Sequence, residues 1–376
     1  MDNENTNFIS EEDTSQSIIK CSCCGAKLTF LPGTHSLKCE FCGTINEIKI
    51  DENLRQEAVK ELDYLSVVAE LKNEGSSQAQ EIHTVKCQSC GAETTFDENV
   101  VSSKCDFCGS PLTVNKNQTV KKIKPKALLP FSVERFQGEE MYRQWLKSLW
   151  FAPSDLKKNA EKSEVLSGVY LPYWTFDAKT VTNYRGKRGD NYYTEETYKN
   201  AQGQEQTRQV KHTNWSMKSG VVRNVFDDII QAASSSLPSS FLNSLQPWNL
   251  QDLVAYDEKF MSGFKAETYS VDIEKGFDGA KKIMDSEINK SIRKDIGGDE
   301  QQIDSKNVNI SDITFKHILL PIWISSYRYN GKSYRFVVNG QNGKVRGDRP
   351  YSTIKIVGTI VGILALLSIL FFGLGK

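Results

Sequence analysis

The chain has 376 residues, of which 39% are hydrophobic and 25% charged, with equal numbers of acidic and basic residues. This length leaves room for two or three domains beyond two small cysteine modules near its start. Residues 1–120 nevertheless hold ten Lys and Arg against nineteen Asp and Glu, a formal net charge of −9, which disfavours DNA or RNA as the ligand of this half.

Residues 1–17 are predicted to be an acidic, disordered N-terminus, and two cysteine modules follow at residues 18–50 and 83–118. Each module contains two C-x-x-C pairs separated by fourteen residues. Four thiolates from two such turns form a closed tetrahedral zinc site. The sequence therefore predicts two structural zinc ions, held by Cys21, Cys24, Cys39 and Cys42 and by Cys87, Cys90, Cys105 and Cys108.

Disulfides or buried structural thiols are the alternatives to zinc. Zinc is favoured because the same spacing occurs twice and because the N-terminus does not resemble a secretory signal. The ninth cysteine, Cys23, aligns with Ser89 of the second module and is interpreted as a spectator, although it could compete for the metal or oxidise beside Cys24.

The two modules match beyond their cysteines, which indicates a duplication. The string KCEFCG at residues 38–43 corresponds to KCDFCG at residues 104–109, so that Phe41 aligns with Phe107. A glycine follows each pair of cysteines and permits the positive φ that wrapping around a metal requires. With about thirty residues each, the modules are too small to fold without their metal.

Residues 51–82 are predicted to form an amphipathic linker helix, because apolar residues recur at steps of three and four. The apolar residues of this pattern are Leu54, Ala58, Leu62, Leu65, Val68 and Leu71. We interpret the helix as a spacer that packs on a ribbon, with a partner-binding helix as the alternative.

Residues 119–350 are predicted to be an α+β domain rich in antiparallel sheet, with an internal LPxW repeat. The string LPYW at 171–174 returns as LPIW at 320–323, and prolines within strands suggest strand starts or sheet edges. Turns are expected at residues 184–186, 329–331 and 342–343, and helices at 136–151 and 273–296. The aromatic residues of this domain are interpreted as core and sheet packing, with a ligand cage as the alternative.

Residues 356–374 contain no charge and are rich in Ile, Leu, Val and Phe, which predicts a transmembrane helix at 354–375. Lys344, Arg346, Arg349 and Lys355 precede this segment, while Lys376 alone follows it. The positive-inside rule then predicts a single-pass protein of the cell membrane whose N-terminal part is cytoplasmic.

No catalytic motif is found. The string GKS at residues 331–333 lacks the earlier glycine of a phosphate loop, and none of the four histidines lies in a metalloprotease pattern. A zinc site of four cysteines also leaves no coordination position for a catalytic water. The chain is therefore predicted not to be an enzyme.

These strings together resemble a bacterial family of zinc-ribbon membrane proteins, often labelled TFIIB-type zinc-ribbon or primosomal protein N′ (replication factor Y) proteins. The resemblance rests on residues 168–177 (GVYLPYWTFD), 295–299 (DIGGD), 314–323 (TFKHILLPIW) and 339–343 (NGQNG). It implies a membrane-anchored recruiter whose partners are SPFH or phage-shock (PspA-type) proteins of the envelope-stress response. The complete phosphate loop that a helicase requires is absent from the sequence.

We therefore expect a non-enzymatic, membrane-anchored adaptor that recruits cytoplasmic proteins to the bilayer and that could form a homo-oligomer. The alternative is a membrane-tethered nucleic-acid-binding or replication-associated factor without helicase activity.

Overall fold

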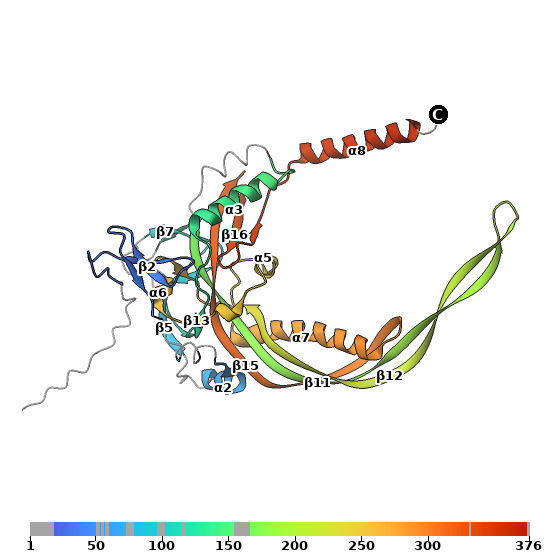
Figure 1. The fold of residues 1–376 in the computed structure, drawn as a ribbon, viewed down its shortest axis with the longest axis horizontal. Coiled ribbons are helices and arrows are strands. Elements are labelled where there is room, and N and C mark those ends of the chain that lie inside the picture. The colour runs from blue at the N-terminus through green and yellow to red at the C-terminus, as the bar shows by residue number, and fades with distance from the viewer. Residues whose placement is uncertain are drawn as a thin grey trace, which may run out of the picture.

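The structure is a computed structural model that describes residues 19–49, 53, 56, 60–72, 79–95, 102–113, 118–153, 166–330 and 332–373. The predicted disordered segment at residues 1–17 lies outside these residues. The cysteine modules lie at one end of a sheet-rich body, from which long curved strands extend to the opposite end (Figure 1). The predicted α+β architecture with two modules of four cysteines is confirmed in this part of the chain.

Ribbon 1, the first cysteine module, is a three-stranded antiparallel sheet of β1 (Leu28–Leu31), β2 (Ser36–Cys39) and β3 (Ile45–Glu47). Ribbon 2, the second module, pairs β5 (Ala79–Lys86) with β6 (Glu93–Thr95) and β9 (Gln118–Ile123). A separate hairpin of β7 (Ser102–Lys104) and β8 (Pro111–Thr113) carries its second pair of cysteines.

The segment between the ribbons differs from the single helix predicted for residues 51–82. Most of residues 51–59 lie outside the described part, and residues 60–72 contain a strand before the helix. β4 (Leu62–Asp63) pairs with β15 (Glu300–Tyr329) of the large sheet, and α2 (Tyr64–Lys72) follows β4. Leu62 therefore takes part in sheet pairing, a long-range contact that the local helical periodicity does not reveal.

The main path of the large sheet has the strand order β12-β11-β15-β10-β13. In addition, β14 pairs with β11, both β4 and β16 pair with β15, and β17 pairs with β16. Its strands, in addition to β4, are β10 (Ala127–Leu128), β11 (Ser167–Lys199), β12 (Glu205–Ala232), β13 (Val254–Ala255), β14 (Lys265–Ala266), β15 (Glu300–Tyr329), β16 (Lys332–Asn339) and β17 (Val345–Gly347). The expected hairpin at 329–331 is confirmed, because Tyr329 pairs with Lys332.

The two LPxW repeats lie side by side in the sheet, since Leu171 of β11 pairs with Leu320 of β15. Both prolines are in the interior of long strands, not at strand starts. Pro172 lies where the neighbour of β11 changes from β14 to β12, and Pro321 lies where the neighbour of β15 changes from β10 to β16. Proline lacks an N–H, so each repeat places it where the ladder hydrogen bonds are interrupted.

The helices of the body are α3 (Arg135–Ser148), α5 (Ser239–Ser244), η1 (Leu250–Asp252), α6 (Glu258–Met261) and α7 (Ile273–Ile296). The helix predicted at residues 273–296 is confirmed with the same bounds. Gly297 caps its C-terminal end, and the φ of 67° at this residue is a conformation that favours glycine. Its buried stripe includes Phe277, Met284 and Ile292, which pack into one core with Trp174 and Phe176 of β11.

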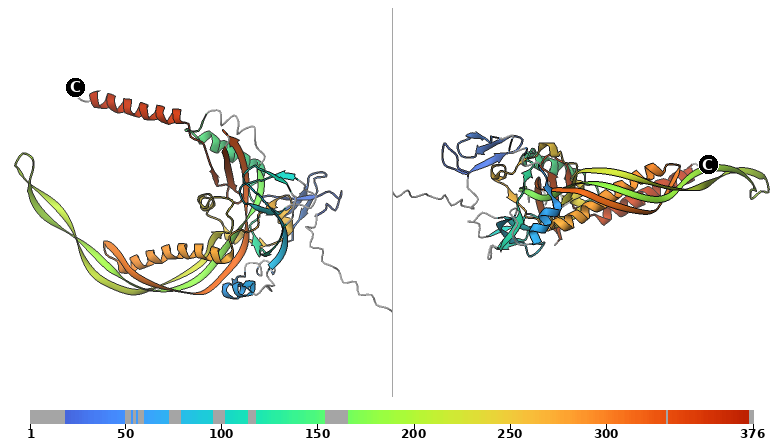
Figure 2. Two further views of the ribbon diagram at one scale, coloured as in Figure 1. Left: turned by 180° about the vertical axis from the view of Figure 1, so that it is seen from behind. Right: turned by 90° about the horizontal axis from the view of Figure 1, so that it is seen from below.

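Beyond the body, β11, β12 and β15 form an extension that we call the arm, with α7 along its concave side (Figures 1 and 2). The turn predicted at residues 184–186 is wrong, because β11 continues through it and Gly186 pairs with Lys218. A Cβ at Gly186 would lie 2.3 Å from the carbonyl oxygen of Gln302, where the register of β15 shifts. This glycine therefore permits close approach of two strands instead of a turn.

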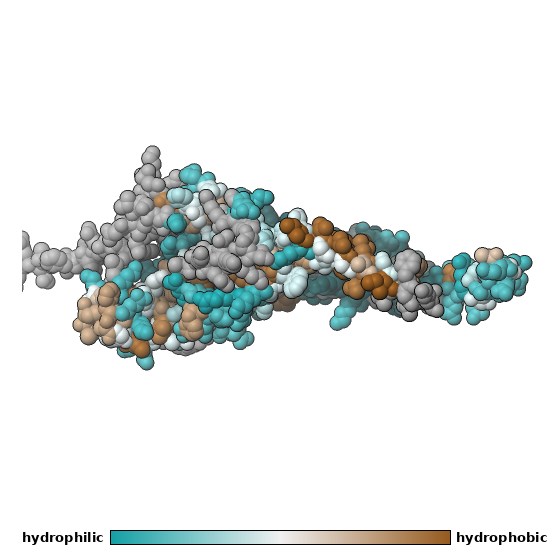
Figure 3. Space-filling model, turned by 90° about the horizontal axis from the view of Figure 1, so that it is seen from above, coloured by the Kyte–Doolittle hydropathy of each residue, from teal (hydrophilic) through white to brown (hydrophobic). Residues whose placement is uncertain are grey.

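The predicted membrane-spanning helix at 354–375, and with it the single-pass membrane localisation, is wrong. Across the residues that the structure describes, no helix has both the length and the apolarity needed to cross a membrane. α8 (Thr353–Gly373) does form, and hydrophobic residues gather along it (Figure 3). Lys355 lies in its first turn, where its ammonium donates to the carbonyl of Ala152 at 2.7 Å, so a charged residue ties the start of α8 to the loop after α3.

Candidate metal centres

The eight predicted ligands come together in two groups of four, as the spacing predicted. In each group the four Sγ atoms lie within 4.8 Å of one another. The shortest Sγ–Sγ distances are 3.5 and 3.6 Å in ribbon 1 and 3.7 Å for both pairs in ribbon 2. Two thiolates bound tetrahedrally at about 2.3 Å from zinc lie about 3.8 Å apart. Each cluster could therefore hold a zinc ion with little rearrangement.

Each pair of ligands is held by the same backbone turn. The N–H of the following glycine donates to the carbonyl of the first cysteine in all four turns, at 2.8 to 2.9 Å. These glycines (Gly25, Gly43, Gly91 and Gly109) have φ between 70° and 78°. A side chain would be strained in this conformation, which explains why glycine occupies the same place four times.

The disulfide alternative does not fit the described cysteines. All nine are free, and the closest sulfur atoms are 3.5 Å apart, far beyond the S–S bond length of about 2.0 Å. Cys23 is exposed and stands outside the first cluster, although its backbone N–H donates to Sγ of Cys21 at 3.4 Å. Its thiol is thus a bystander to the metal site.

Hydrogen bonds prepare two of the thiols to bind a metal as thiolates. The hydroxyl and the backbone N–H of Thr44 lower the pKa of Cys42 to about 6, and the hydroxyl lies 3.1 Å from the sulfur. In ribbon 2 the hydrogen bond with Cys105 lowers the pKa of Cys90 to about 5. A ligand that is already deprotonated near neutral pH binds zinc without the cost of releasing a proton.

Ribbon 2 is built into the core of the protein. Cys87, Cys105 and Cys108 are buried in one apolar cluster with strands β10, β11 and β15. Phe107, between the last two ligands, is completely buried. The neighbouring Asp106 is 7% exposed at its side chain and forms an ion pair of 2.9 Å with Lys265 of β14. The second metal site is therefore continuous with the body.

Ribbon 1 contacts the body through its strands and leaves one cysteine of each pair exposed. Phe30 of β1 packs edge-on against Phe260 of α6, with ring centroids 5.3 Å apart, and its N–H donates to the carbonyl of Ser262. Of the second pair, Cys42 is exposed, and Phe41 beside it is 84% exposed. The aromatic side chain that anchors ribbon 2 is thus exposed in ribbon 1.

A third cluster, made of acidic side chains instead of cysteines, was not predicted from the sequence. Glu61, Asp177 and Asp228 lie close enough together to bind a cation, and the ammonium of Lys316 lies 2.9 Å from both Glu61 and Asp228. Burial, reinforced by Glu61, raises the pKa of Asp177 to about 7. Because Lys316 supplies the cation, we interpret the cluster as a clamp that holds the segment between the ribbons on the sheet. Its members are far apart in the sequence, and no spacing pattern indicates them.

The comparisons with known proteins are sparse. The chain is similar to an uncharacterized protein of Bacillus subtilis (strain 168), YdjG, with 25% identity over 243 residues that make up 64% of this chain and 67% of the relative. No protein-family model matches the chain, and no solved structure matches it. Of the resemblance described above, the two zinc-ribbon-like clusters of four cysteines are therefore present, while the TFIIB-type or primosomal label has no support from these comparisons.

Proposed function

We propose that this protein is a non-enzymatic adaptor that binds a protein partner through the exposed knuckle of ribbon 1, residues 39–45. The observation that carries the proposal is the different burial of two equivalent phenylalanines. Phe107 is completely buried in the body, whereas Phe41 is 84% exposed.

An exposed aromatic residue on a metal-bound turn suits the centre of a small interface. Phe41 lies between two metal ligands, so that the backbone beneath it is held by the cluster. Ile45 of β3, close by in the chain, is 59% exposed and extends the apolar surface. Aromatic anchors contribute much of the energy of protein interfaces, and an anchor that is already ordered loses little entropy on binding. Both features favour a protein as the ligand.

The resemblance found in the sequence suggests which partners to test first. SPFH and phage-shock-type proteins of the envelope-stress response are the candidates that it implies. The proposal requires only a protein–protein contact at ribbon 1.

The test compares proteins that co-purify with the full chain and with its Phe41→Ala variant. We expect at least one protein to be retained by the wild type and to be lost with Phe41→Ala, because truncation of an interface anchor costs about 2 kcal/mol or more. Phe136→Ala is the matched control, since Phe136 of α3 is also exposed, at 61%, and lies far from the knuckle in the sequence. Mass spectrometry of the retained proteins is the measurement.

A partner that is retained equally by both variants would place the contact elsewhere. If Phe136→Ala also loses the partner, and to the same extent, then any exposed phenylalanine would promote the association. Binding of duplex DNA by the wild type at micromolar affinity in physiological salt, with a steep salt dependence, would instead favour a nucleic-acid-binding function.

A further inference from the structure

The three strands of the arm have one covered face and one open face. Tyr184 of β11, Asn224 of β12 and Lys306 of β15 each hydrogen-bond a side chain of α7. Successive residues of a strand point to opposite faces, so the residues on either side of these three point away from the helix. We call this second face the outer face of the arm.

The outer face is basic at its centre. Arg185 and Lys187 of β11 and Arg223 of β12 lie on it, and within the described part of the chain no ion pair or hydrogen bond joins their side chains to a neighbour. Residues 178–189 of β11 and 206–226 of β12 contain no acidic residue. The three charges are therefore available to a negatively charged ligand.

The acidic groups that border the outer face already have partners. Asp312 forms an ion pair with Lys179 at 2.9 Å, and Glu300 forms one with Lys211 at 2.8 Å. Asp304, at the register shift of β15, accepts a hydrogen bond from the side chain of Gln302 at 2.9 Å. They do not neutralise the central group of cations.

An apolar row runs beside these cations along β12. Met217, Val221 and Val225 alternate with polar residues on the outer face and are 73%, 48% and 76% exposed. No strand pairs with the other edge of β12 in the described part of the sheet. Exposed aliphatic side chains at an open sheet edge are typical of surfaces that bind an extended segment of another protein.

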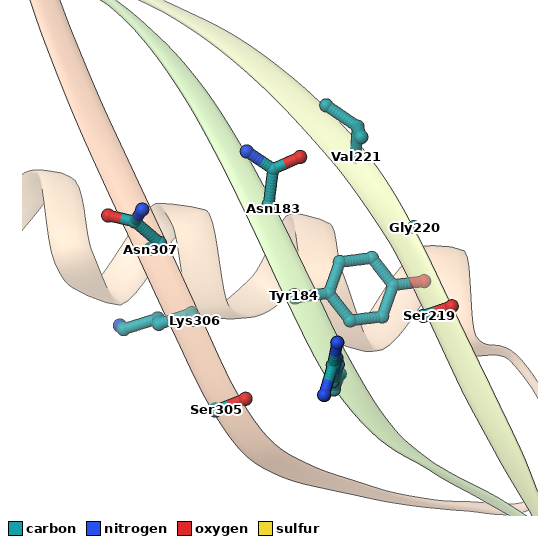
Figure 4. A pocket seen from close by; sticks show the side chains of 9 residues that line it. Asn183, Tyr184, Ser219, Gly220, Val221, Ser305, Lys306 and Asn307 are labelled. Carbon is teal, nitrogen blue, oxygen red and sulfur yellow. The ribbon is translucent and has the colours of Figure 1, made fainter.

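A hollow of about 530 Å³ lies on the arm at this point and is lined by residues from all three strands (Figure 4). Its lining from the outer face includes Asn183, Arg185, Ser219, Val221, Ser305 and Asn307. The amides and hydroxyls can pair with a backbone, and Arg185 can form a bidentate pair with a carboxylate. The hollow thus combines backbone and carboxylate recognition at one place.

We propose that the outer face of the arm binds an extended acidic segment of a protein partner. The cations attract its carboxylates, and the aliphatic row packs on the apolar side chains between them. A protein segment is favoured over a single-stranded nucleic acid because the row is aliphatic, whereas bases require aromatic stacking platforms. Residues 179–187 of β11 and 217–225 of β12 place no aromatic side chain on this face. Trp215, the next residue of the row after Met217, is 43% exposed and is the first aromatic residue beyond this stretch.

This site is distinct from the knuckle of ribbon 1 and goes beyond the proposed function. Ribbon 1 and the arm extend from the body in different directions (Figure 1). An adaptor with both surfaces connects two proteins, and each surface can fail in a test without the other.

The experiment measures fluorescence anisotropy of a labelled peptide of about twelve residues, with Glu at every second position and Val or Thr between them, added to the full-length protein. We expect saturable binding that weakens as salt is raised, and no binding of the same peptide with Gln in place of Glu. The combined variant Arg185→Gln, Lys187→Gln and Arg223→Gln should weaken binding about tenfold or more.

Two controls keep the result specific. Lys218→Gln removes an exposed cation from the opposite face of β12 and should bind the acidic peptide as the wild type does. Phe41→Ala should also leave this binding unchanged. Unchanged thermal unfolding of the triple variant shows that its loss of binding is not a loss of fold.

Equal binding of the Glu and Gln peptides, or equal binding by the triple variant and the wild type, would overturn the proposal. A single-stranded oligonucleotide that binds more tightly than the acidic peptide, and loses that affinity in the triple variant, would assign the face to nucleic acid instead.

Discussion

Ribbons 1 and 2 share one cysteine spacing and one local turn, yet they occupy different environments. Three of four ligands are buried in ribbon 2, while Cys24 and Cys42 of ribbon 1 are exposed. The contrast is sharpest at Phe41 and Phe107, which are 84% and 0% exposed. Both copies contribute to the core, since Cys21 and Cys39 of ribbon 1 lie in one buried cluster with Leu128 of the body. The same turn is nevertheless buried in ribbon 2 and presented to solvent in ribbon 1. The difference lies in what each copy packs against.

The largest effect expected from this comparison is the loss of a metal ligand. Cys105→Ser should reduce the zinc content from two ions per chain to one and destabilise the whole body by several kcal/mol, because its ligands belong to the core. Cys42→Ser should also remove one zinc but destabilise the body less, because Cys42 is exposed and only Cys21 and Cys39 of its cluster reach the core. Elemental analysis and thermal unfolding measure the two effects. Equal destabilisation by both variants would show that ribbon 1 is as much part of the core as ribbon 2.

The two phenylalanines provide a smaller and more local test. Phe107→Ala should cost about 3–5 kcal/mol in the free energy of unfolding, because it leaves a cavity in a packed core. Phe41→Ala should change this free energy by less than about 0.5 kcal/mol, since an exposed side chain loses few contacts. Urea denaturation monitored by circular dichroism measures both. A large cost for Phe41→Ala would mean that its ring is buried in the protein and cannot reach a partner.

The smallest expected effect concerns pH and is confined to ribbon 1. Hydrogen bonds from Thr44 lower the pKa of the metal-free Cys42 thiol to about 6, so zinc binds it without displacing a proton above that pH, and protons compete with the metal below it. Thr44→Val removes the hydroxyl and raises the pKa of Cys42, so that ribbon 1 should release zinc at a higher pH, by less than about one unit. A zinc-sensitive dye follows the release.

Ribbon 2 is the internal control for this measurement, because Thr44 belongs to ribbon 1 and its hydroxyl bonds the sulfur of Cys42. The zinc of ribbon 2 should be released at the same pH in the variant and the wild type. If the release pH shifts for both zinc ions, or for neither, the proposed role of the Thr44 hydroxyl is contradicted.

Features that depend on neighbouring residues could be predicted from the sequence. The eight ligands could be identified because zinc requires four thiolates in a fixed geometry and two short turns supply them. The bounds of α7 follow from its apolar stripe and from the glycines after Ile296. The hairpin after Tyr329 follows from an Asn-Gly pair, in which Asn330 has a φ of 48°.

Features that depend on contacts between distant parts of the chain could not be predicted from the sequence. The turn expected at Gly186 is a continuous strand, because β15 approaches β11 there. Leu62 fits a helical pattern but pairs with β15, and the apolar C-terminal run predicts a membrane span that the described helices do not provide. The acidic clamp around Lys316 unites residues from separate segments of the chain.

The sequence by itself determined where metal can bind, since the ligand spacing, the glycines and the thiols are all local to each module. Only the tertiary structure decided which module is exposed. Phe107 meets the apolar residues of β10, β11 and β15, whereas ribbon 1 packs through β1 and leaves Phe41 in solvent. Metal geometry is set by a few neighbouring residues, but burial depends on surfaces that come together only when the whole chain folds.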